Sequence, residues 1–141
     1  MRKVKELGLK IKLDTNGSRP GMLASYMTEN LLDYVAMDVK APLEKYHLLG
    51  FSDSGMIEDS INLIKISGIA HEFRTTCPKI FLQPEDFPKM AELVGKTSKW
   101  YLQTFNPRKT LDPAYNNVAS YSREELEVII KNLGIGNAEA R

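Results

Sequence analysis

The sequence predicts an α/β fold: a partial (half) TIM-like barrel of about four parallel βα units, formed as a single domain over residues 1–141. Two observations support this prediction. Segments with the two-residue period of strands alternate along the chain with segments of helical period. The expected strands also begin about 25 to 35 residues apart, close to the roughly 30 residues that one βα unit of an eight-fold barrel takes.

The first half of the chain contains two of the expected strands. A short amphipathic helix is expected over residues 2–9, and it starts without a cap, as if the chain had been opened inside an element. The first strand lies in KIKLDTNGS and ends at the turn-forming residues Asn16 and Gly17. A helix that begins with proline is expected over residues 20–32, because proline suits the first helical position. The second strand covers residues 34–40.

The second half of the chain repeats the pattern and closes with a helix. A stripe of isoleucines predicts a helix that ends at Gly68. The last helix begins with a capping box formed by Ser122 and Glu125, and Gly134 ends it. Between these two helices we expect a strand over residues 69–76, a short helix over 84–94, a strand over 99–105 and a polar loop, TLDPAYNN.

Polar and apolar side chains alternate along the expected strands. Parallel strands that are covered on both faces should instead be almost continuously apolar, because unpaired charges are costly to bury. We therefore expect a curved sheet with helices outside and a polar inner face, with the polar residues near the carboxyl ends of the strands, where such folds bind ligands. A sheet whose second face is merely solvated explains the alternation too, although the mixture of acids, bases and amides favours a site. The expected polar row comprises Lys12, Asp14, Asn16, Ala36, Asp38, Lys40, Glu72, Arg74, Thr76, Tyr101 and Gln103.

Composition excludes several classes of function. The net charge of +1 and the absence of a run of like charges argue against nucleic-acid binding. No apolar stretch approaches the roughly 20 residues that span a bilayer, so no membrane segment is expected. Cys77 is the one cysteine, so the chain can form neither an internal disulfide nor a cysteine-based metal site by itself. These features favour a cytoplasmic protein.

Four segments carry a resemblance to a known family. They are LDTNGS (residues 13–18), DYVAMDVKAP (33–42), FRTT (73–76) and YLQTFNPRKTLDP (101–113). Together they resemble the C-terminal portion of the radical S-adenosylmethionine activating enzymes, such as pyruvate formate-lyase activating enzyme and anaerobic ribonucleotide reductase activating protein. The resemblance implies a partial barrel of about six strands, in which a Cys-x3-Cys-x2-Cys loop holds a [4Fe–4S] cluster. Neither that loop nor the family's glycine-glycine-glutamate segment occurs in this sequence.

The resemblance also implies five cofactor-binding residues. Asp14 and Asn16 match strand-end residues beside S-adenosylmethionine, and Lys40 and Arg74 match basic positions in the same cavity. Asn106 falls where some relatives have a cofactor-facing histidine. These residue types suit the ligand, since a carboxylate pairs with Lys or Arg and ribose hydroxyls bond to Asp or Asn.

Simpler interpretations of the same residues stay open. Asp14 is also placed to cap the turn after the first strand, and Lys40 and Arg74 are placed for ion pairs with Asp38 or Glu72. Packing or surface roles are expected for the remaining candidates, which are Cys77, His47, His71, Trp100 and Tyr101.

The functional expectation follows from the resemblance. The chain would help to bind S-adenosylmethionine, whose reductive cleavage yields the 5′-deoxyadenosyl radical that generates a glycyl radical on a partner enzyme. We expect the chain alone to be inactive, because it lacks the cluster cysteines. Its expected partners are a glycyl-radical enzyme, a missing N-terminal half, or a second copy bound through open sheet edges. The alternatives are a non-catalytic interaction module and, less favoured without a glycine-rich loop, a phosphate-binding domain.

Overall fold

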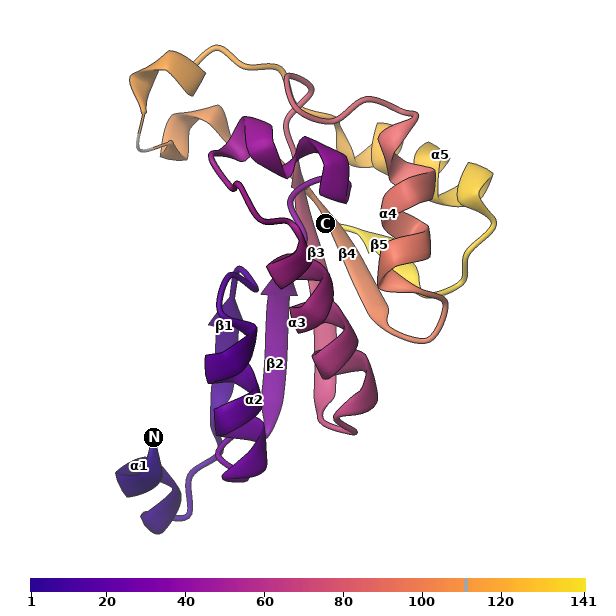
Figure 1. Ribbon diagram of the computed structural model, residues 1–141. Helices are drawn as coiled ribbons and strands as arrows, with labels where there is room; N and C mark the ends of the chain where they lie inside the picture. Colours follow the sequence, from indigo (N-terminus) through magenta and orange to yellow (C-terminus); the bar gives the residue numbers. More distant parts are fainter. Residues whose placement is uncertain (111) are drawn as a thin grey trace.

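The computed structural model describes residues 1–110 and 112–141, and its central feature is one sheet of five parallel strands (Figure 1). The strand order follows the chain, β1-β2-β3-β4-β5. The strands are β1 (Lys12–Thr15), β2 (Tyr34–Asp38), β3 (Ala70–Cys77), β4 (Lys99–Thr104) and β5 (Ala138–Ala140). The α-helices are α1 (Arg2–Glu6), α2 (Pro20–Thr28), α3 (Gly55–Ile66), α4 (Asp86–Val94) and α5 (Arg123–Leu133). Short 3₁₀ helices are η1 (Leu43–Leu49), η2 (Pro107–Lys109) and η3 (Pro113–Tyr115).

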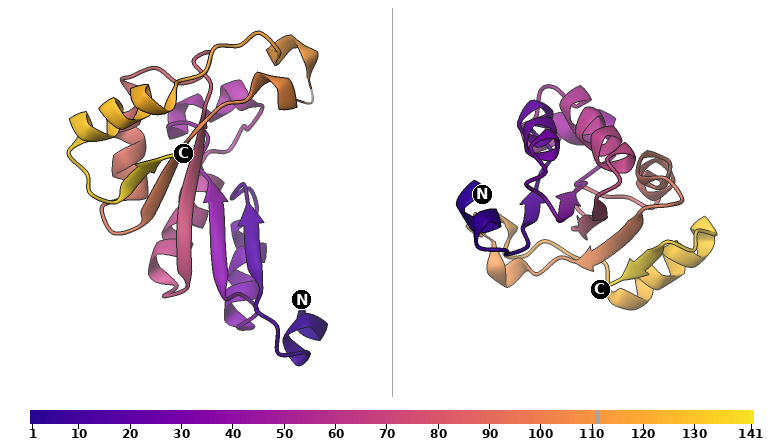
Figure 2. Two further views of the ribbon diagram at one scale, coloured as in Figure 1. Left: turned by 180° about the vertical axis from the view of Figure 1, so that it is seen from behind. Right: turned by 90° about the horizontal axis from the view of Figure 1, so that it is seen from below.

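Helices α2 to α5 follow one another around the outside of the curved sheet (Figure 2). The strand side chains that face them form the core, and the α3 isoleucine stripe is fully buried there, as its spacing predicts. The α/β architecture and the parallel pairing are therefore confirmed, in the form of a partial TIM-like barrel. The largest fully buried residues of this core include Val35, Met37, Phe73, Trp100, Leu102, Ile57, Ile61 and Ile64.

Local sequence signals determine both ends of helix α5. The Ser122 hydroxyl accepts the Glu125 N–H at 3.2 Å, and the Glu125 carboxylate accepts the Ser122 N–H at 2.8 Å. This is the predicted capping box. At the other end Gly134 has φ 62°, a left-handed conformation that ends the helix at little cost for glycine.

Three features of the fold differ from the prediction. The sheet has five strands, and not about four, because Ala138–Ala140 pairs with β4. The second helix ends at Thr28, four residues early, since Asn30 has φ 54° and turns the chain toward β2. The expected loop after β2 contains η1, which the Lys45 ammonium ties to the buried Asp86 carboxylate at 2.6 Å. Leu111, in the expected polar loop, lies outside the described residues.

Adding one methyl group to the turn after β1 should strongly lower the stability of the protein. Gly17 has φ +74°, and a Cβ built there would lie 2.0 Å from Met37 Cε. Its carbonyl also accepts the buried Ser60 hydroxyl at 2.7 Å. We expect Gly17→Ala to lower the free energy of unfolding by about 2 kcal/mol, from the combined overlap and backbone strain.

Urea denaturation measures this change in stability. Gly21→Ala is the matched control, because a Cβ at Gly21 meets nothing within 4 Å. Equal urea-denaturation midpoints for the wild-type protein and Gly17→Ala would contradict this prediction, because they would show that the turn accommodates the methyl group without cost.

No helix in the described part of the chain is long and apolar enough to cross a membrane.

Candidate functional site

The sheet face opposite helices α2 to α5 carries a row of charged and polar side chains, which we call the polar face. Strand pairing places these residues level with one another. Asp14 of β1 lies opposite Ala36 of β2, which lies opposite Glu72 of β3. Asp38 of β2 lies opposite Arg74 of β3. The alternation predicted from the sequence is therefore realised in space. The polar face comprises Lys12, Asp14, Tyr34, Asp38, Lys40, Glu72, Arg74, Tyr101 and Gln103.

Near the carboxyl ends of β1 and β2, and level with the middle of β3, lie four charged residues, which we call the carboxyl-end cluster: Asp14, Asp38, Lys40 and Arg74. The Arg74 guanidinium contacts Asp14 Oδ1 at 3.1 Å and Asp38 Oδ1 at 2.9 Å, and so joins all three strands. Lys40 Nζ lies 3.5 Å from Asp38 Oδ2. The two cations and two carboxylates of the cluster balance in charge, and a further cation adjoins them, since Lys12 Nζ lies 3.9 Å from Asp14 Oδ1.

Exposure divides the cluster into two kinds of residue. The Arg74 side chain is 21% exposed and is engaged by two carboxylates. Asp14 and Lys40 are 58% and 50% exposed, so solvent or a ligand can reach them. The backbone at Lys40 is held in place, because its N–H donates to the Tyr46 hydroxyl at 3.0 Å. The arrangement can therefore bind a ligand that carries charges of both signs.

A second group of contacts lies nearer the amino ends of the strands. The Tyr34 hydroxyl donates to Glu72 Oε2 at 2.8 Å, and Lys12 Nζ lies 3.6 Å from Glu72 Oε1. Burial, and then the hydrogen bond to Glu72, raise the pKa of Tyr34 to about 12. A further contact lies level with Arg74, where the Arg141 guanidinium stacks 3.3 Å from the centre of the Tyr101 ring. Sequence reasoning missed this stacking because it did not predict β5.

Asn16 and Asn106 lie in local turns. The Asn16 side chain accepts the Ser18 N–H at 3.1 Å, one residue beyond the end of β1. The Asn106 side chain accepts the Arg108 N–H at 3.0 Å and caps η2. In residues 1–110 and 112–141 neither side chain has a recorded contact with the carboxyl-end cluster. The structure thus brings together Asp14, Lys40 and Arg74 out of the five predicted site residues.

The only cysteine, Cys77, is fully buried. Its thiol donates to the Thr75 carbonyl at 3.3 Å, and burial raises its pKa to about 12. A [4Fe–4S] cluster needs several accessible thiolates, so the cysteine content of this chain does not fit one. Among the described residues, no group of three His, Cys, Asp or Glu side chains is placed to hold a metal ion.

The raised pKa of Cys77 should affect both the reactivity of the thiol and the pH dependence of stability. We expect the native thiol to react with a disulfide reagent at pH 8 only when the protein unfolds, since the thiolate is the reactive form. Because folding raises this pKa, the thiol's contribution to stability is complete below the unfolded value and is lost as pH rises toward about 12. Rapid stoichiometric labelling of folded protein at pH 8 would contradict the buried position.

The two histidines have structural contacts. His47 is exposed and its Nδ1 lies 2.7 Å from the Glu44 carbonyl oxygen. His71 is half-buried, with Nδ1 2.8 Å from the Ile69 carbonyl oxygen and Nε2 3.0 Å from the Ser98 hydroxyl. Neither belongs to the carboxyl-end cluster.

Comparisons with known proteins bear on the fold and on the family that the chain resembles. No family model matches the chain. The chain is 29% identical over 136 residues to a Methanocaldococcus jannaschii protein named as a glycyl-radical enzyme activating enzyme, and spans 57% of that protein's length. Its fold is similar to the crystal structure of a domain of pyruvate-formate lyase-activating enzyme from Bacteroides vulgatus. The TM-score is 0.75 at 12% identity, and the match covers 99% of this chain and 85% of that one.

Proposed function

Because the chain is a relative of the radical S-adenosylmethionine activating enzymes, we propose that its polar face forms part of the S-adenosylmethionine site of such an enzyme. The main observation behind this proposal is the Arg74 bridge, which joins charged residues of β1, β2 and β3 near the carboxyl ends of β1 and β2. Parallel α/β folds place their ligands at this end of the sheet.

The residues of the carboxyl-end cluster suit the ligand's polar groups. In the proposed site, the Lys40 ammonium pairs with the ligand carboxylate, and Asp14 accepts hydrogen bonds from ribose hydroxyls. Arg74 acts through Asp14 and Asp38, because both carboxylates already engage its guanidinium. S-adenosylmethionine supplies the sulfonium that is cleaved to a 5′-deoxyadenosyl radical in this family, whereas these side chains bind and orient it.

The catalytic part of the proposal needs a second component. These 141 residues contain one buried thiol, so the cluster that reduces S-adenosylmethionine would have to be bound elsewhere. We therefore propose that the chain alone is inactive, and that it works in the cytoplasm beside a cysteine-containing half and a glycyl-radical enzyme.

An alternative function is a non-catalytic module that binds a partner chain. The observation in its favour is that β1 and β5 end the sheet without a further strand in the described residues. Open edges readily pair with another chain, so a homodimer or a partner-bound state is expected. Sedimentation at micromolar concentration tests this point, and a single sharp monomer boundary would count against the homodimer.

Calorimetric titration with S-adenosylmethionine tests ligand binding. We expect saturable heat from the wild-type chain and affinity about tenfold weaker in Lys40→Met, which removes the carboxylate's proposed partner. Lys131→Met, on exposed α5, is the matched control and should bind like the wild type. A folded chain that gives no heat would remove ligand binding from the proposal.

A further inference from the structure

The peptide group between Val39 and Lys40 is held on both sides by hydroxyl groups of buried residues, one from Thr75 and one from Tyr46. From this arrangement we infer that Tyr46 is a positioning residue for the ligand site. It fixes the backbone from which the Lys40 ammonium reaches the ligand, and it does not touch the ligand itself. The inference rests on the proposed function, since it concerns the lysine that would pair with the carboxylate of S-adenosylmethionine.

Strand pairing ends just before Lys40. The last recorded pair between β2 and β3 is Asp38 opposite Arg74. One more backbone hydrogen bond follows, from the Val39 N–H to the Arg74 carbonyl at 2.8 Å. The next two backbone groups, the Val39 carbonyl and the Lys40 N–H, belong to one peptide group. Side-chain hydroxyls bond to both of them, so side chains continue the hydrogen bonding beyond the end of the strand.

The carbonyl side of this peptide group is tied to the core. The Thr75 hydroxyl donates to the Val39 carbonyl at 2.6 Å and accepts the Trp100 indole N–H at 2.9 Å. Thr75 and Trp100 are both buried. A hydroxyl has one hydrogen to donate, and the indole N–H can only donate, so the direction of both bonds is fixed. The Val39 carbonyl therefore cannot turn away without breaking a hydrogen bond inside the core.

The N–H side of the peptide group is tied to η1. The Tyr46 hydroxyl accepts the Lys40 N–H at 3.0 Å, and Tyr46 is 3% exposed. The Tyr46 ring packs edge-on against Phe51, with 6.3 Å between the ring centroids. The Tyr46 carbonyl also accepts the Phe51 N–H at 3.1 Å, across the turn in which Gly50 has φ 77° and ends η1. Packing and the turn together hold the hydroxyl at the Lys40 backbone.

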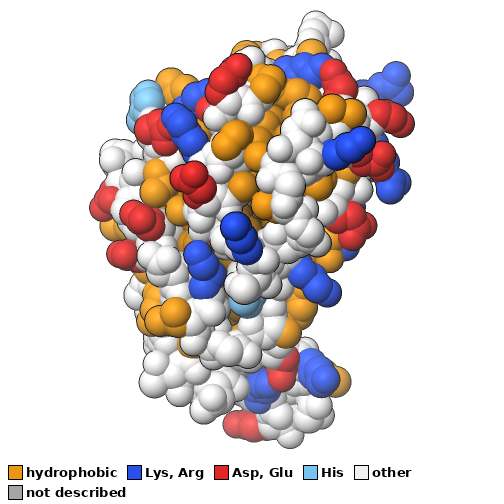
Figure 3. Space-filling view, turned by 90° about the vertical axis from the view of Figure 1, so that its right-hand side faces the viewer, with side chains coloured by type: hydrophobic (Ala, Val, Ile, Leu, Met, Phe, Trp, Pro, Cys, Tyr) orange, Lys and Arg blue, Asp and Glu red, His pale blue; other side chains and the backbone are white. Residues whose placement is uncertain are grey.

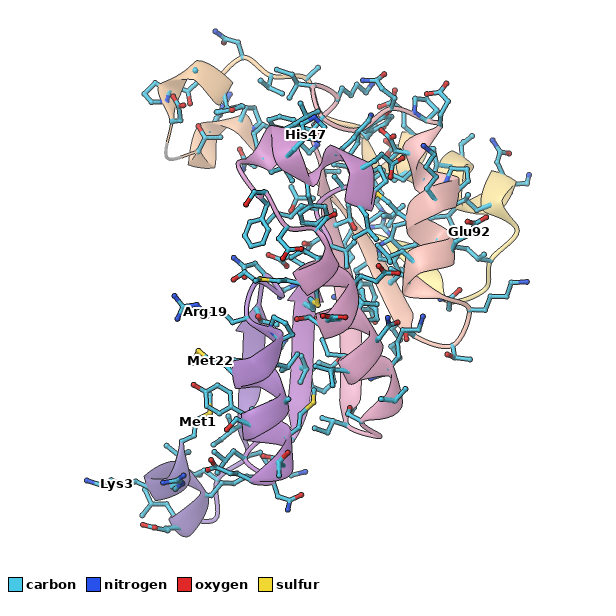
Figure 4. The ribbon with its side chains drawn as sticks, viewed as in Figure 1. Met1, Lys3, Arg19, Met22, His47 and Glu92 are labelled. Atoms are coloured by element: carbon cyan, nitrogen blue, oxygen red, sulfur yellow. The ribbon has the colours of Figure 1, made fainter. Side chains whose placement is uncertain are left out.

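Two ion pairs hold η1 against α4. Lys45 pairs with Asp86 at 2.6 Å, and the Asp86 side chain is 5% exposed, whereas Glu44 and Lys89 form an exposed pair. Losing Lys45 would leave a buried carboxylate without its cation, so this pair fixes η1 more strongly than the exposed one. Figure 4 shows η1, marked by the label His47, beside α4. Acidic and basic side chains are intermixed over α4 and α5 on the same side of the molecule (Figure 3).

These contacts allow Lys40 to be exposed and still well placed. Its side chain is 50% exposed, while its N–H and the carbonyl before it bond to buried residues. A backbone that is fixed before binding reduces the conformational entropy that is lost when the ligand binds. Only the Lys40 side chain then has to be ordered by the carboxylate. Loss of the Tyr46 hydroxyl should consequently weaken binding through Lys40.

Tyr46→Phe removes this hydroxyl and keeps the ring, and calorimetric titration of the whole chain with S-adenosylmethionine measures the effect. We expect the affinity to fall about fivefold, as the loss of one hydrogen bond of ordinary strength would give. Tyr121→Phe is the matched control, because the Tyr121 hydroxyl is also buried and donates to the Leu82 carbonyl at 3.1 Å. Both variants should lower the urea-denaturation midpoint similarly, but Tyr121→Phe should leave the affinity unchanged.

A double-mutant cycle with Lys40→Met separates positioning from a general loss of stability. If Tyr46 acts through Lys40, adding Tyr46→Phe to Lys40→Met should change the affinity by less than about twofold. An equal loss of affinity in both backgrounds, or wild-type affinity in Tyr46→Phe, would overturn the inference and leave the proposed function standing. A folded wild-type chain that gives no heat would overturn the proposed function, and the inference with it.

Discussion

Replacing Arg74 by methionine is expected to reduce the affinity for S-adenosylmethionine by at least about tenfold and to lower stability modestly. The guanidinium holds Asp14 and Asp38 at 3.1 and 2.9 Å, and without it two carboxylates on neighbouring strands lose their shared partner. Since the side chain is 21% exposed, solvent screening limits the cost in folding free energy to about 1 kcal/mol. Calorimetry measures the first effect and urea denaturation the second.

Two further variants separate a positioning role from a general loss of charge. Arg74→Lys keeps the charge but not the planar fork that contacts two carboxylates, so its affinity should lie between those of the wild type and Arg74→Met. Arg123→Met removes an exposed arginine whose partner is Glu127, one helical turn away, and should change neither quantity. Unchanged affinity in Arg74→Met would show that the bridge does not organise the site.

Replacing Trp100 by alanine is expected to have the largest effect on stability, about 3–5 kcal/mol. The indole is fully buried, and its N–H donates to Thr75 Oγ1 at 2.9 Å. That hydroxyl donates in turn to the Val39 carbonyl at 2.6 Å, so the contacts run from β4 through β3 to the end of β2. Since small domains have about 5–15 kcal/mol in total, the variant should unfold at much lower urea concentration.

Conservative and surface variants provide the comparison for Trp100→Ala. Trp100→Phe keeps most of the apolar volume and loses the indole N–H, so it should cost about 1–2 kcal/mol. Val128→Ala, at a position that is 57% exposed, should change stability by less than about 0.5 kcal/mol. Equal denaturation midpoints for Trp100→Ala and Val128→Ala would contradict the core described above.

The sequence predicted elements whose signals are local. The α3 isoleucines and the α5 capping box depend on spacing along one helix, and both were confirmed. Strand β5 could not be predicted in this way, because Ala138–Ala140 consists of two alanines around a glutamate and has no apolar run. Its extended form depends on pairing with β4, which is contact with a distant part of the chain. The early end of α2 likewise depends on Asn30 adopting a left-handed conformation.

The candidate site was predicted to a similar extent. Alternation along the strands placed Asp14, Asp38 and Arg74 on one face, since a side-chain period of two is a property of each strand. The contacts between these residues also depend on the register of the parallel strands. The sequence predicted that the strands are parallel but not their register. The position of Arg141 over the Tyr101 ring was not predicted, because it depends on β5.

Amide chemical-shift mapping during titration with S-adenosylmethionine tests whether the polar face is a ligand site. We expect the largest shifts at Asp14, Asp38, Lys40 and Arg74, which the Arg74 bridge joins across three strands. Helix-facing residues such as Ile61 and Trp100 should move little. Shifts spread over the helices, or no shifts in a chain that remains folded, would contradict the assignment of the polar face as a ligand site.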